Sequence, residues 1–152
     1  FSVYRASLSD PLTYVRFFGH VLGHADYEHY MSNMLLILLV GPGLEEKYGS
    51  RRLLGCVVLT ALISGLVQFL LFPGSALLGA SGIVFMMIVL SSLAGMREGE
   101  VPLTLVLVVL LYLGGEVVDA ATARDSVSQL THIVGGLCGA GLGFAMGRGR
   151  RI

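Results

Sequence analysis

The strongest constraint on this chain is its long apolar runs that contain no charged residue. Leu53–Phe72 and Ala76–Gly95 are each 20 residues long and lack Lys, Arg, Asp and Glu. A transmembrane helix needs about 20 mostly apolar residues. Charged residues form only 13% of the chain, whereas an ordinary soluble domain has about 25%. Too few polar side chains remain to cover a water-exposed surface, so we expect a membrane protein.

Three further segments are weaker candidates for membrane spans. Val101–Gly115 is short, Leu130–Gly147 is rich in glycine, and Tyr30–Leu44 is long enough only if it extends to Tyr27–Lys47. Pro42 is expected to kink or end that helix early, because proline removes a backbone donor. We therefore expect an all-α fold, a polytopic membrane helix bundle in one domain, 1–152. It has an outer loop at 1–26 and transmembrane helices at about 27–47, 50–72, 76–96, 101–116 and 130–148.

The basic residues predict the orientation of this bundle. If the five spans alternate in direction, seven of the ten Lys and Arg residues lie on one side of the membrane. Cytoplasmic loops carry the excess of Lys and Arg, so the C-terminus is expected inside and the loop at 1–26 outside. The formal net charge is zero, which gives no electrostatic footprint for nucleic acid. The basic residues on the inner side are Lys47, Arg51, Arg52, Arg97, Arg148, Arg150 and Arg151.

Polar residues at membrane depth are candidates for function. Four such residues lead into the first predicted span: His20, His24, His29 and Asn33. His29 and Asn33 are four residues apart, so they lie on the same face of a helix. The pattern fits a metal site, a set of donors aimed at a reacting oxygen, or hydrogen bonds that fasten the outer loop. We favour the structural interpretation for His20 and His24, and the functional one for His29 and Asn33.

Ser81 is a candidate nucleophile in Gly79-Ala80-Ser81-Gly82 at the outer end of the third span. This motif alone is weak, but a helix N-terminus offers free N–H groups to a developing oxyanion. His132 is expected at the same side and depth, where it could act as general base.

Glycines at four-residue spacing follow His132, and such faces let membrane helices approach closely. They would bring His132 to Ser81, so we expect Ser81, His132, His29 and Asn33 to converge in one cavity that opens outward. The spaced glycines are Gly135, Gly139 and Gly143.

The sequence resembles the rhomboid intramembrane serine proteases. The resemblance rests on four motifs in the family's order: His24-Ala-Asp-Tyr-Glu-His29-Tyr-Met-Ser-Asn33, Gly-Pro-Gly-Leu-Glu45, Gly79-Ala-Ser81-Gly82 and His132-Ile-Val-Gly135-Gly136. It implies an endopeptidase without cofactor or metal, in which a Ser-His dyad cleaves single-pass transmembrane substrates near the outer face of the lipid bilayer. By analogy the chain would lie in a prokaryotic plasma membrane.

The resemblance also implies a role for individual residues. Ser81 would be the nucleophile and His132 the general base, with an oxyanion hole from the Ser81 N–H and the side chains of His29 and Asn33. Phe85 would pack on the catalytic histidine. The supporting residues would be Arg16 and Glu45, a pair that organises the outer loop, His24 as a structural or water-retaining residue, and the glycines Gly79, Gly82, Gly135 and Gly139.

The sequence departs from the family pattern in three places. Val15 stands where a tryptophan is usual, and Phe85 stands where tyrosine is commoner. The family core has six helices, and Phe1 falls within the outer loop, so the first family helix is not seen in this sequence.

Other classes of protein remain as alternatives. They are a catalytically inactive rhomboid-like protein that binds membrane helices, a small channel or transporter component, and a purely structural membrane subunit. The sequence does not predict the oligomeric state.

Overall fold

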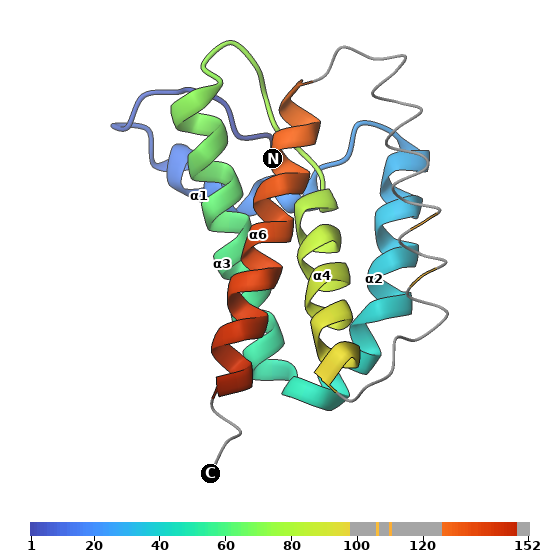
Figure 1. The fold of residues 1–152 in the computed structure, drawn as a ribbon. Helices are drawn as coiled ribbons and strands as arrows, with labels where there is room; N and C mark the ends of the chain where they lie inside the picture. Colours follow the sequence, from blue (N-terminus) through green and yellow to red (C-terminus); the bar gives the residue numbers. More distant parts are fainter. Residues whose placement is uncertain (98–105, 107–109, 111–125, 149–152) are drawn as a thin grey trace.

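The computed structural model describes residues 1–97, 106, 110 and 126–148. The described part is all-helical apart from one isolated β-bridge, which confirms the predicted fold class. Figure 1 shows α4 between α6 and α2. The predicted span at 101–116 lies almost wholly outside the described residues. The helices are α1 (Pro11–Gly19), the 3₁₀ helix η1 (His20–Leu22), α2 (Tyr27–Tyr48), α3 (Ser50–Leu71), α4 (Ser81–Arg97) and α6 (Ser126–Arg148).

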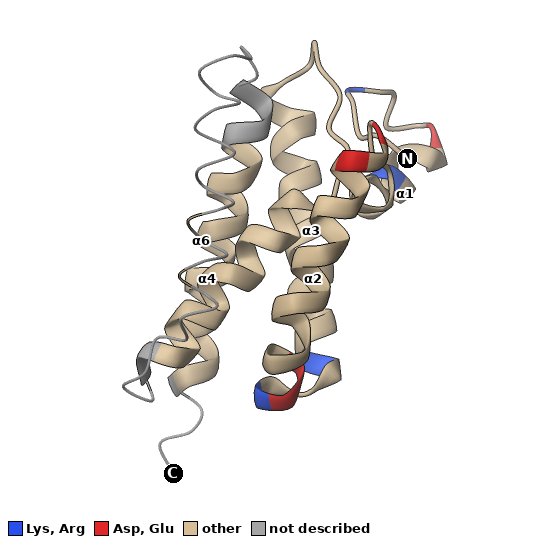
Figure 2. Cartoon of the chain, turned by 90° about the vertical axis from the view of Figure 1, so that its right-hand side faces the viewer, with Lys and Arg blue, Asp and Glu red and all other residues tan. Residues whose placement is uncertain are grey.

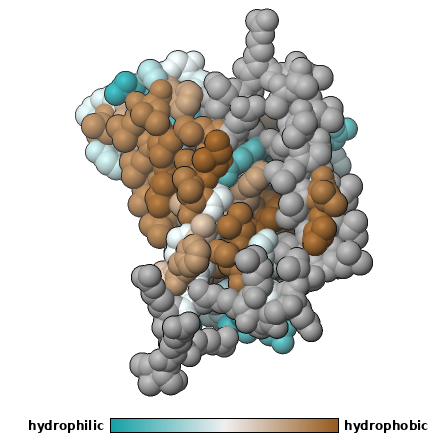
Figure 3. All heavy atoms as spheres, viewed as in Figure 1, coloured by the Kyte–Doolittle hydropathy of each residue, from teal (hydrophilic) through white to brown (hydrophobic). Residues whose placement is uncertain are grey.

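Within the described residues, two helical stretches are long and apolar enough to cross a membrane: Ser50–Leu71 and Leu130–Gly147. A third apolar stretch, Ser81–Gly95, is shorter. Figure 2 shows the Lys, Arg, Asp and Glu residues near the ends of the described helices, with uncharged middles between them. Figure 3 shows apolar side chains covering much of one outer face. This pattern suits helices whose middles lie in hydrocarbon.

Helix α2 does not end at Pro42, which was one of the two effects expected of this proline, and its bounds are close to the expected span at about 27–47. It continues to Tyr48, because contacts beyond the proline hold its last turns. Leu44 is buried in the main core cluster. Lys47 Nζ donates a hydrogen bond to the carbonyl oxygen of Ala94 at 3.0 Å, which ties the far end of α2 to α4. Tertiary contact therefore outweighs the backbone donor lost at the proline.

Helix α4 begins at Ser81, five residues later than the predicted span at 76–96. Leu77 pairs with Val3 in an antiparallel bridge, and Gly79 has a φ of 115°, which lies outside the helical region. The segment 76–80 is therefore a non-helical connection that precedes the helix. Helix α6 begins at Ser126, four residues earlier than the predicted span at 130–148.

Helix α4 is the centre of the described bundle. Its buried apolar residues point in several directions, as expected for a helix enclosed by others. Its closest neighbour is α6. A Cβ atom at Gly135 would overlap the carbonyl oxygen of Gly82, and one at Gly139 would overlap that of Met86. The prediction that these glycines permit a close helix approach is confirmed. The buried apolar residues of α4 are Ile83, Val84, Met86, Met87, Ile88, Leu90 and Ala94.

We expect Gly139→Ala to destabilise the bundle by about 1–3 kcal/mol, the usual cost of overpacking, because the new methyl group meets the Met86 backbone. Gly141→Ala is the matched control on the same helix, since a Cβ there meets nothing within 4 Å. Thermal unfolding in detergent micelles measures both variants. Equal midpoints for the two variants would show that the α4–α6 contact is not as close as described.

A pH dependence follows from His20, which is 1% exposed. Its Nε2 donates to the carbonyl oxygen of Ala61 at 3.0 Å, and burial lowers its pKa below the ordinary 6.5. The unfolded chain therefore takes up the proton before the folded chain does, so this contribution to stability is lost as pH falls below 6.5. Unfolding midpoints between pH 8 and 5 should fall less steeply in His20→Gln than in the parent chain. Parallel slopes would contradict the assignment.

Candidate active site

Ser81 is the first residue of α4 and is partly buried. The first helical hydrogen bond at this end runs from Val84 N to the carbonyl oxygen of Ala80 at 3.0 Å. The N–H groups of Ser81, Gly82 and Ile83 therefore precede the regular ladder of the helix, as expected at an N-terminus. Ser81 thus lies at the positive end of the helix dipole, the environment that its sequence context predicted.

His132 lies on α6 beside the first turn of α4. Its imidazole stacks on Phe85, with ring centroids 4.4 Å apart and an angle of 14° between the planes. Phe85 is one helical turn beyond Ser81. Thr131, next to His132, packs against Gly82, whose Cβ position would lie 3.1 Å from Thr131 Cγ2. The structure therefore brings the His132 turn of α6 onto the Ser81 turn of α4.

His29 and Asn33 occupy the first turns of α2, and the starts of α2, α4 and α6 lie at the same end of the bundle (Figure 1). The His29 ring lies against Gly79: a Cβ there would be 2.7 Å from Cε1 and Nε2. Asn33 is 1% exposed, and its Nδ2 donates to the carbonyl oxygen of His29 at 2.7 Å.

Local hydrogen bonds orient the His29 ring. Asp26 caps α2 by accepting from His29 N at 2.8 Å. Ala25 N donates to His29 Nδ1 at 3.5 Å. An imidazole nitrogen that accepts carries no proton, so this bond places the proton of neutral His29 on Nε2. Nε2 is one of the two ring atoms that face Gly79, which makes it a donor directed toward the start of α4.

His24 packs against His29. The two ring centroids are 5.0 Å apart in an edge-to-face arrangement, and the ring of Tyr30 is 5.4 Å from that of His24. The His20 side chain is directed toward α3, where its Nε2 bonds the carbonyl oxygen of Ala61. The described residues contain no group of three or more His, Cys, Asp or Glu that could hold a metal ion.

Arg16 and Glu45 do not form the pair that the resemblance implied. Arg16 forms an ion pair with Asp10 at 3.2 Å, and its guanidinium lies 4.8 Å from the centre of the Tyr4 ring. Glu45 accepts a hydrogen bond from Ser50 Oγ at the other end of α2. Because α2 continues through Pro42, Glu45 lies about 27 Å along the helix from Tyr27. Arg16 is therefore paired with Asp10 and not with Glu45.

Three buried polar residues of α3 were missed from the sequence: Thr60, Ser64 and Gln68. Ser64 Oγ lies 3.3 Å from the Cβ position of Gly82. Gln68 Nε2 donates to the carbonyl oxygen and Oγ of Ser75, at 3.1 and 3.0 Å, and so restrains the loop that leads to Ser81. Their four-residue spacing within an apolar span was the available signal, since it places them on one helix face.

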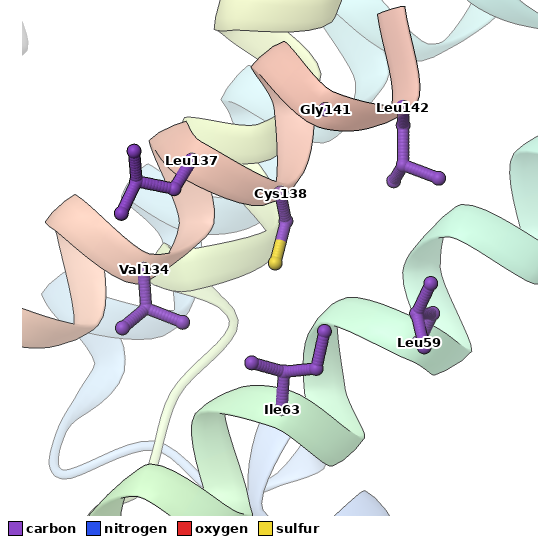
Figure 4. Close-up of a pocket in the computed structure, with 7 residues that line it drawn as sticks. All are labelled: Leu59, Ile63, Val134, Leu137, Cys138, Gly141 and Leu142. Carbon is purple, nitrogen blue, oxygen red and sulfur yellow. The ribbon is translucent and has the colours of Figure 1, made fainter. Parts of the chain in front are cut away.

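An apolar groove lies between α3 and α6. It has a volume of about 400 Å³. Figure 4 shows the sulfur of Cys138 among aliphatic side chains. Cys138 and Cys56 are both free cysteines, and Cys56 is buried in the main core cluster. The thiol of Cys138 is the one titratable or nucleophilic side chain among the residues that line the groove. The residues that line it are Leu59, Ile63, Val134, Leu137, Cys138, Gly141 and Leu142.

Comparisons with known proteins identify the family of this chain. The Rhomboid domain family matches residues 11–149. Rhomboid-related protein 1 of Caenorhabditis elegans is 34% identical over 142 residues, which cover 86% of this chain and 39% of the relative. Rhomboid protease GlpG of Enterobacter sp. (strain 638) is 34% identical over 85 residues, covering 56% of this chain and 30% of the relative.

A mammalian relative matches nearly the whole chain. Mouse rhomboid-related protein 2 is 28% identical over 161 residues, which cover 91% of this chain and 53% of the relative. The chain thus spans between about a third and a half of the length of these relatives. The match to the Rhomboid domain covers most of the sequence, including all four motifs on which the resemblance rested. The chain therefore belongs to the rhomboid family of membrane proteins.

Proposed function

We propose that this chain is an intramembrane serine endopeptidase that cleaves single-pass transmembrane proteins with Ser81 and His132. One observation supports the proposal most directly. His132 stacks on Phe85, one turn from Ser81, across the glycine contact between α4 and α6. Family membership and the relatives named as proteases support the reaction class.

In this proposal Ser81 Oγ attacks the scissile carbonyl carbon while His132 accepts its proton. Negative charge then develops on the carbonyl oxygen. In this proposal the Ser81 N–H, His29 Nε2–H and the second hydrogen of Asn33 Nδ2 donate to that oxygen. His132 next returns the proton to the departing amine, and a water molecule activated by His132 hydrolyses the acyl-enzyme.

The proposal also covers the membrane location and the orientation of the protein. The positive-inside distribution of Lys and Arg supports a cytoplasmic C-terminus and an active site that opens to the outer face. A plasma membrane location follows by analogy. The substrate would enter from the bilayer and unwind locally, because a regular helix shields its own carbonyl groups from attack.

A serine-directed fluorophosphonate probe tests the nucleophile. We expect the parent chain in detergent to be labelled, and Ser81→Ala and His132→Ala to lose labelling. Ser92→Ala is the matched control on the same helix, since Ser92 Oγ only bonds the carbonyl oxygen of Ile88. Labelling that persists in Ser81→Ala would place the nucleophile elsewhere. A folded parent chain that takes no label would favour the inactive, helix-binding alternative.

A substitution at Asn33 tests the oxyanion hole. Losing one such donor commonly lowers kcat by about 10²–10³, so Asn33→Ala should be impaired by that factor on a transmembrane model substrate. Ser32→Ala is the matched control, because Ser32 Oγ also bonds the carbonyl oxygen of His29 but is exposed. Equal kcat values for the two variants would remove Asn33 from the oxyanion hole.

A further inference from the structure

We propose that Val3 is a positioning residue for Ser81. Its main chain pairs with Leu77 and, together with the carbonyl oxygen of His20, fixes the extended segment 76–80 that leads into α4. This inference rests on the proposed function, because it concerns the placement of the nucleophile.

The pairing of Val3 with Leu77 is reciprocal. Val3 N donates to the carbonyl oxygen of Leu77 at 2.9 Å, and Leu77 N donates to the carbonyl oxygen of Val3 at 2.8 Å. Val3 is 0% exposed and Leu77 5% exposed, in a cluster with Phe17 and Phe69. Buried backbone groups need partners, so water cannot readily replace these two bonds. The pairing therefore has a defined geometry.

His20 fixes the same segment two residues further on. Its carbonyl oxygen accepts from Gly79 N at 2.9 Å. Its side chain is in turn bonded to the backbone of α3 through Ala61 at 3.0 Å. Leu77 and Gly79 are thus both held, and only Ala80 separates the second of them from Ser81.

This arrangement links the outer loop to the nucleophile. Gly79 has a φ of 115° and lies against the His29 ring, so a shift of the segment moves Ser81 relative to both the oxyanion donors and His132. A misplacement of about 1 Å can reduce a rate by about 10²-fold. Losing the Val3 bond should therefore slow the attack by Ser81 even where the helices remain folded.

Proline at position 3 tests the pairing, since it removes the N–H that bonds Leu77. Val3→Ala keeps this N–H and loses only packing. Ala6→Pro places a proline where the structure gives no hydrogen bond to the backbone N–H. The measurements are the fluorophosphonate labelling kinetics of Ser81, as maximal rate and half-saturating probe concentration, together with the thermal unfolding midpoint.

We expect the maximal labelling rate of Val3→Pro to be at least fivefold below those of Val3→Ala and Ala6→Pro, with the half-saturating concentration unchanged. A purely structural role would lower the unfolding midpoint of Val3→Ala as well and slow both variants alike. A difference of less than fivefold would overturn the inference. A parent chain that is not labelled would instead contradict the proposed function itself.

If Val3→Pro does not fold, a disulfide cross-link between positions 3 and 77 tests the pairing instead. Paired residues of this kind have Cα atoms about 5.5 Å apart, within the usual disulfide range of about 4.4–6.8 Å. Val3→Cys/Leu77→Cys, with Cys56 and Cys138 changed to Ala, should form a disulfide on oxidation and keep at least half the labelling rate of its reduced form. Failure of the disulfide to form, or a rate below half, would overturn the inference.

Discussion

The backbone contact between α4 and α6 is the constraint on which the rest of the candidate site depends. At Gly82 and Gly135 the two helices approach so closely that a single Cβ atom would overlap a carbonyl oxygen. In a membrane, helices gain little from the hydrophobic effect between them, so close packing of small residues is a main source of their association. The same contact sets the separation of Ser81 and His132. Stability and site geometry thus share one set of glycines.

Much of this arrangement could be predicted from the sequence. Apolar runs such as Leu53–Phe72 predict helices because they are long enough to span a bilayer and carry no charge. The glycine spacing after His132 predicted a close approach to another helix, and the structure identifies α4 as that partner. The stacking of Phe85 on His132 agrees with the family resemblance. These features depend on local pattern, which a single sequence records directly.

Other features depend on contacts between distant segments and were not predictable. The segment before α4 pairs through Leu77 with Val3, more than seventy residues earlier in the chain. The persistence of α2 beyond Pro42 is supported by Lys47 and the carbonyl oxygen of Ala94. Glu45 does not reach Arg16, because a continuous helix carries Glu45 to the opposite end of the bundle. A pattern within one segment contains no information about such partners.

The late start of α4 has a consequence for where chemistry can occur. The chain passes through the non-helical segment 76–80 before it becomes helical at Ser81, and Figure 1 shows α4 beginning below the end of α3. The first residue of α4 is therefore recessed beneath the level at which α3 ends. Depth within the bundle is thus set by the point at which the connecting segment gives way to α4.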